Sequence, residues 1–98
     1  MIHLNKELIS KLKDFIAMST NRISDDGMHE VIHYFEHGEY EMAFEGLVIE
    51  LMLVNKHPED FNYSEWRNLA IQFNLEHEPT FEGDFWKKFT TWGNKESK

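Results

Sequence analysis

Apolar residues recur at helical spacing through almost the whole chain, and this periodicity limits the fold more than any other feature. No segment shows the alternating pattern and β-branched enrichment of a strand. The sequence therefore predicts an all-α fold: a compact single-domain bundle of about five helices over residues 1–98, with residues 92–98 as a frayed tail. The expected helices cover residues 5–18, 25–37, 39–55 and 62–73, and a fifth begins at Glu78.

Helix-boundary signals place a helical hairpin at the centre of this bundle. Ser24 is a good cap for the second helix, and Asp25 and Asp26 suit the positive end of its dipole. Gly38 fits the left-handed residue that ends a helix, and the next helix follows at once. Asn5 stands where the first helix needs its cap. We expect the second and third helices to form an antiparallel hairpin hinged at Gly38.

The third expected helix carries apolar residues on two opposite faces. Its second stripe has the spacing i, i+4, i+7 and i+11 and consists of Met42, Gly46, Ile49 and Leu53. A helix that is apolar all round usually lies centrally and is covered on both sides. The alternative is an exposed patch for a partner, which leaves room for a homodimer.

The composition excludes several classes of protein. A chain of 98 residues is one domain, and no apolar run approaches the roughly 18 residues that a membrane span needs. The first residues lack the basic start and apolar stretch of a secretion signal. Cysteine is absent, although small secreted domains usually depend on disulfides. We therefore expect a cytoplasmic protein that does not engage a membrane.

The net charge of −8 is concentrated in one stretch of the chain. Residues 24–60 hold ten acidic residues against one basic residue, Lys56, whereas the flanking segments are nearly balanced. Such a surface repels nucleic acid and anionic membranes, so neither is expected as a partner. In one interpretation the acidic residues form a solvated face that serves solubility; in the other they attract a cationic protein partner.

His29, Glu30 and His33 form a literal H-E-x-x-H, the motif of zinc metalloproteases. A catalytic zinc needs a third protein ligand, and Glu36 and Glu39 stand where the metzincin motif continues with glycine and histidine. Both histidines point away from the apolar stripe of their helix, which is typical of solvated side chains. Motifs for other nucleophiles, phosphates or dinucleotides are missing from the sequence. We expect no catalytic residue, metal ligand or cofactor; the alternatives are a weak zinc site and a minimal zinc hydrolase.

The stretch EHGEYEMAFEGL, residues 36–47, resembles a pattern of small bacterial immunity proteins of the Maf type and of contact-dependent growth inhibition systems. In that pattern a helix ends in a glycine–glutamate–aromatic turn, and the next helix opens with alanine, a bulky apolar residue, glutamate and leucine. The similarity covers about residues 28–54. The same turn is similar to that of a tetratricopeptide hairpin, but the second copy that a repeat needs about 34 residues further on is missing.

The resemblance implies an immunity protein, which is a stoichiometric inhibitor and not an enzyme. Such a protein binds and neutralises the C-terminal domain of a cognate bacterial toxin in the cytoplasm. The toxins are commonly nucleases, and a nuclease is basic around the site that binds its polyanionic substrate. A helical adaptor that binds another host protein through the same surface is the alternative.

The acidic residues around the expected hairpin form the predicted partner-binding surface. On the helical wheel they lie beside or opposite the apolar stripes, so we expect their carboxylates to reach solvent. The competing prediction places the contacts on the aromatic C-terminal helix, with Trp86 or Trp92 as anchors. The predicted surface consists of Asp25, Asp26, Glu30, Glu36, Glu39, Glu41 and Glu45.

Overall fold

The structure, a computed structural model, describes residues 6–95 and has helices but no strand in that range. The predicted all-α single-domain bundle is confirmed. None of the described helices is long and apolar enough to cross a membrane. The helices are α1 (Lys6–Met18), α2 (Asp25–Glu36), α3 (Tyr40–Leu53), α4 (Tyr63–Gln72) and α5 (Phe85–Asn94).

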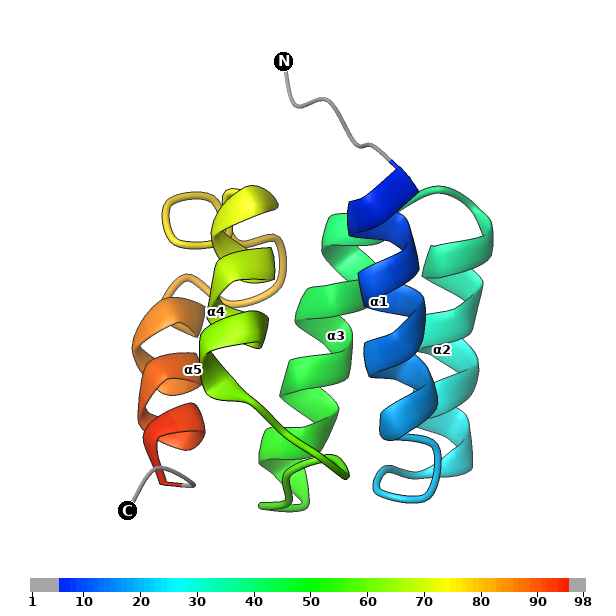
Figure 1. Cartoon of the computed structure of the whole chain (residues 1–98), viewed down its shortest axis with the longest axis horizontal. Coiled ribbons are helices and arrows are strands. Elements are labelled where there is room, and N and C mark those ends of the chain that lie inside the picture. The colour runs from blue at the N-terminus through cyan, green and yellow to red at the C-terminus, as the bar shows by residue number, and fades with distance from the viewer. Residues whose placement is uncertain (1–5, 96–98) are drawn as a thin grey trace.

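The third helix, α3, runs through the middle of the bundle, with α1 and α2 on one side and α4 and α5 on the other (Figure 1). Its residue Phe44 is wholly buried, and the ring centroid lies 6.4 Å from that of Phe15 on α1. The rings of Trp66 on α4 and Phe89 on α5 are 5.7 Å and 6.2 Å away. One aromatic side chain therefore connects α3 to three other helices, and rings at these distances attract one another beyond their area of contact.

Three helices end in the same motif, in which a residue just beyond the helix is left-handed. After α2 this residue is Gly38 (φ 75°), whose N–H donates to the Phe35 carbonyl at 3.1 Å, while the following N–H donates to the Tyr34 carbonyl at 2.9 Å. The helices α3 and α4 end in the same way at Asn55 and Asn74. These are the bonds of a Schellman motif, which satisfies carbonyl groups that a helix end leaves open. The predicted hinge at Gly38 is confirmed, and α2 and α3 pack as an antiparallel hairpin (Figure 1).

Side-chain caps begin two of the helices. Ser24 caps α2 as predicted, because its hydroxyl accepts the Gly27 N–H at 3.0 Å. Asn62 caps α4 by accepting the Glu65 N–H at 3.1 Å. Each cap satisfies an N–H group that would otherwise lack a partner within its helix. Asn5, the predicted cap of the first helix, lies outside the described residues.

The C-terminal part of the chain differs from the prediction in two ways. The fifth helix begins at Phe85 instead of near Glu78, because residues 78–84 form an irregular segment that a side chain of α3 holds in place. The helix then continues to Asn94, so it includes residues 92–94 of the segment expected to fray. Residues 96–98 lie outside the described range.

The end of α5 is fixed by close packing on α4. Gly93 is buried against the Tyr63 ring so tightly that an added methyl group would overlap the ring. Burial raises the pKa of the Tyr63 hydroxyl above its ordinary value, and the Arg67 guanidinium opposes part of this rise. Only glycine allows this close approach of the two helices.

The second apolar stripe of α3 is covered only in part. Met42, Gly46 and Ile49 are half-buried, and Leu53 is 74% exposed. The helix is central, as the first interpretation expects, and the stripe is exposed, as the alternative expects, only at its end, at Leu53. The ring of Phe81, from residues 78–84, covers the stripe at Gly46.

We predict that Gly38→Val lowers the free energy of unfolding by at least about 1 kcal/mol, because a β-branched residue is strained at a φ of 75° even where space is open. Gly46→Ala is the control, since it lies within a helix and its methyl group would make ordinary contacts with Val31 and Phe81 at 3.9 Å. That variant should gain up to about 1 kcal/mol. Urea unfolding followed by circular dichroism measures both, and a Gly38→Val protein as stable as the wild type would contradict the hinge.

Candidate functional site

Most of the predicted partner-binding carboxylates reach solvent from the α2–α3 hairpin. The ion pairs formed among the described residues lie elsewhere and involve Lys11, His77 and Lys88. The hairpin therefore presents negative charge that no cation of the described chain neutralises, and this charge is free to act on a partner. Glu41 is half-buried, and the exposed members are Asp25, Asp26, Glu30, Glu36 and Glu39.

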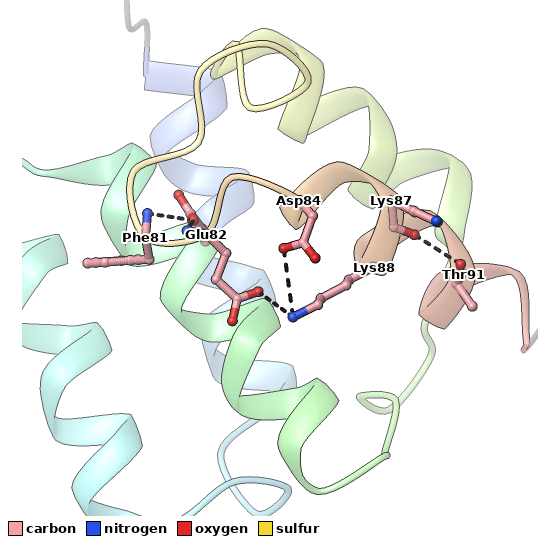
Figure 2. Close-up of polar contacts among 7 residues, drawn as sticks. Phe81, Glu82, Asp84, Lys87, Lys88 and Thr91 are labelled. Carbon is pink, nitrogen blue, oxygen red and sulfur yellow. Dashed lines mark hydrogen bonds and ion pairs between the residues drawn. The ribbon is translucent and has the colours of Figure 1, made fainter.

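Glu45 is wholly buried, so its assignment to the binding surface is wrong. Its carboxylate accepts three consecutive backbone N–H groups: Thr80 at 2.6 Å, Phe81 at 2.8 Å and Glu82 at 3.1 Å. Figure 2 shows the bond at the Phe81 amide. Charge-assisted bonds of this length offset the loss of hydration of a buried carboxylate. Glu45 is therefore a structural residue that fixes residues 78–84 against α3.

The hairpin and residues 78–84 enclose a groove of about 280 Å³. Three carboxylates line it, those of Glu30, Glu50 and Glu82, and no basic side chain does. Sequence reasoning missed Glu50 and Glu82, because only the fold brings them beside Glu30. The apolar and small residues of the groove are Gly27, Val31, Tyr34, Gly46, Ile49 and Phe81.

A second hollow, of about 310 Å³, lies at the Gly38 turn. It brings Glu39 and Glu41 together with Glu78, which comes from the connection between α4 and α5. Glu36, expected in the same group, does not line this hollow. The acidic surface thus extends beyond the hairpin, and Glu78 is a further residue that the sequence analysis did not include.

A third groove, of about 480 Å³, lies between the end of α3 and α5 and has a different character. Lys87, Lys88 and Lys95 line it together with Glu82 and Asp84, so positive and negative charge nearly cancel. The Lys88 ammonium lies between the two carboxylates, 3.4 Å from Glu82 and 3.7 Å from Asp84 (Figure 2). This groove therefore carries both positive and negative charge, whereas the hairpin surface is negative only.

The H-E-x-x-H residues lie on the solvent side of α2. His29 and His33 are both exposed, and the ring centroids of His33 and His37 lie 4.2 Å apart. The His37 Nδ1 atom is hydrogen-bonded to the His33 carbonyl oxygen at 2.8 Å. Among residues 6–95, no three His, Cys, Asp or Glu side chains gather closely enough to hold a metal ion. Among the described residues, no third ligand lies close enough to complete a catalytic zinc site with His29 and His33.

One of the two tryptophans of the competing aromatic site, Trp92, lies in the hydrophobic core. Trp92 is only 4% exposed, and its indole N–H donates to the Lys56 carbonyl at 3.0 Å. The Trp92 side chain therefore offers very little surface to a partner. Trp86 is half-buried, with the Arg67 guanidinium 5.8 Å from its ring centroid.

Comparison of the chain with protein-family models, curated proteins and solved structures gives no match. The resemblance to immunity proteins therefore stays a prediction from residues 36–47. What the protein does has to be inferred from the surfaces described above.

We predict that Glu45→Ala lowers the free energy of unfolding by about 2–4 kcal/mol, because three N–H groups lose a charged acceptor. Glu45→Gln should lose less but remain clearly destabilised, since its amide group turns a donor toward an N–H donor. The exposed Glu39→Gln is the control, with a change within about 0.5 kcal/mol. Hydrogen exchange at Thr80, Phe81 and Glu82 should quicken only in the Glu45 variants; unchanged exchange would contradict the role assigned to Glu45.

Proposed function

We propose that this protein is an immunity protein, a non-catalytic inhibitor that binds a basic toxin domain, such as a nuclease, in the cytoplasm. The α2–α3 hairpin is the proposed binding surface. The observation that carries the proposal is the uncompensated negative charge of the hairpin. No cation of the described residues pairs with its exposed carboxylates. The resemblance of residues 36–47 to immunity proteins supports the same function.

The charge of the hairpin suits a partner that must be captured quickly. Opposite charge on the two proteins steers their encounter and raises the association rate well above that of neutral surfaces. Carboxylates that become desolvated against lysine or arginine also slow dissociation, because charge-assisted bonds are stronger away from water. A nuclease has such cations around the site that binds its phosphate-rich substrate.

Contacts within the chain hold the hairpin in place without a partner. Its turn is fixed by the hydrogen bonds at Gly38, and its inner face is fixed by the burial of Phe44 and Leu47 in the core. A preorganised surface loses little conformational entropy on binding, which favours high affinity. The exposed carboxylates thus stand on a rigid support.

The first test is to co-express the protein with a toxin domain encoded next to its own gene. We expect growth to be rescued and a one-to-one complex to form. Glu36→Lys combined with Glu39→Lys should lower the association rate at low salt at least about tenfold and flatten its salt dependence. Both residues are exposed and unpaired among the described residues, so the fold should persist.

The matched control is Asp14→Lys combined with Glu59→Lys, which changes the net charge equally at exposed acids outside the hairpin. We expect the control to slow association far less than the hairpin variant does. Equal slowing would mean that net charge alone acts and would contradict the hairpin as the binding surface. A neighbouring gene that encodes no toxin, with capture of another host protein instead, would favour an adaptor.

A further inference from the structure

We propose that the groove between α2, α3 and residues 78–84 is a receptor for a single arginine side chain of a basic protein partner. This inference rests on the proposed function and deepens it, because it assigns the chemical group that the hairpin would hold. The groove combines an apolar floor with carboxylates at its margin, and no basic side chain of residues 6–95 lines it.

The floor of the groove is open because a glycine stands where α3 faces Phe81. A side chain at Gly46 would begin 3.9 Å from both the Phe81 ring and the Val31 methyl group. At Gly46 the floor therefore admits a methylene-sized group with apolar contacts on both sides, and the groove of about 280 Å³ leaves space for the rest of an arginine stem. Long cationic side chains bury such stems against apolar surface and keep the charged group at the margin.

The aromatic wall favours arginine over lysine. Tyr34 and Phe81 both line the groove with their ring centroids 5.8 Å apart, and Phe81 is 42% exposed although its N–H donates to the Glu45 carboxylate. A guanidinium group stacks on aromatic faces and also bonds carboxylates with its planar fork of donors, whereas an ammonium group does neither as well. An exposed ring on a fixed segment is a ready stacking surface.

The carboxylates around the groove are placed to receive such a group. Glu50 is half-buried and lies against Gly27 so closely that a side chain there would displace it. This position puts its charge at the first turn of α2, where the helix dipole is positive and favours it. Glu30 forms no ion pair among the described residues, and Glu82 shares the Lys88 ammonium with Asp84 (Figure 2). The two unpaired carboxylates, Glu30 and Glu50, are the expected partners of the guanidinium group.

The test is a titration with Nα-acetyl-arginine amide, followed by the amide NMR signals of Gly27 and Gly46. Nα-acetyl-citrulline amide, a neutral analogue of the same shape, is the ligand control. We expect saturable shifts at these two glycines with the arginine compound and weaker binding of the matched lysine compound. The citrulline compound should leave the signals in place. Equal binding of the citrulline compound would show an apolar groove only, and equal binding of the lysine compound would show a cation site without arginine preference; either result overturns the proposal.

Two kinds of variant separate the groove from general attraction by acidic charge. Glu30→Gln combined with Glu50→Gln should raise the dissociation constant at least about tenfold, whereas Glu36→Gln combined with Glu39→Gln should change it less than about twofold. Gly46→Leu should abolish the shifts by filling the floor while every carboxylate remains; thermal unfolding confirms that it is folded. Equal weakening by the two glutamate pairs, or unchanged binding in Gly46→Leu, would overturn the groove.

The titration needs no toxin, so its outcome is separable from that of the proposed function. Toxin capture that depends on Glu36 and Glu39 while the arginine compound does not bind would leave the immunity function standing and reject the groove. Binding of the arginine compound in the absence of any toxin partner would support the groove and reject the immunity function.

Discussion

The hydrogen bonds between the Glu45 carboxylate and the N–H groups of residues 80–82 are the constraint on which the rest of the surface depends. They tie the connection between α4 and α5 to the central helix. Without them the ring of Phe81 and the carboxylate of Glu82 would have no fixed place beside Gly46. The buried Glu45 carboxylate thus fixes residues 78–84 as one wall of the candidate site. Apolar contacts alone would leave several arrangements of this loop close in energy.

The helix boundaries that depend on neighbours in sequence could be predicted, and those that depend on distant residues could not. Ser24 and Gly38 act through bonds to groups three to five residues away, so their roles follow from the local sequence. The partners of Glu45 lie 35 to 37 residues away, so the local sequence does not identify them, although the apolar residues on two faces of its helix favour a covered position. For the same reason the sequence misplaced the start of α5 and omitted Glu50, Glu78 and Glu82 from the acidic surface. A helical wheel distinguishes an apolar face from a polar one, but it does not report what a distant loop will cover.

Helix dipoles account for some of the hairpin acids and leave others to be explained. Asp25 and Asp26 occupy the first turn of α2, and Glu41 that of α3, where negative charge is stabilised. Glu36 is the last residue of α2, where the dipole is negative, and its carboxylate gains nothing from the helix that carries it. An acidic residue at this position that forms no ion pair among residues 6–95 agrees with the proposed contact with a basic partner. The acids of this surface therefore differ in what they contribute to folding, although they look alike in the sequence.

The long sequence separation of the Glu45 contacts also bears on the order in which the molecule assembles. The α2–α3 hairpin closes through a turn of a few residues and has a low entropic barrier to formation. The wall that contains Phe81 joins only when α4 and the loop after it have reached α3. We therefore expect the charged hairpin to form early and the groove to be completed last. In the native protein the same segment should be among the first to open locally, because it belongs to no helix and its hydrogen bonds to α3 all go to one side chain, although Lys88, Asn74 and the Tyr34 ring also contact it.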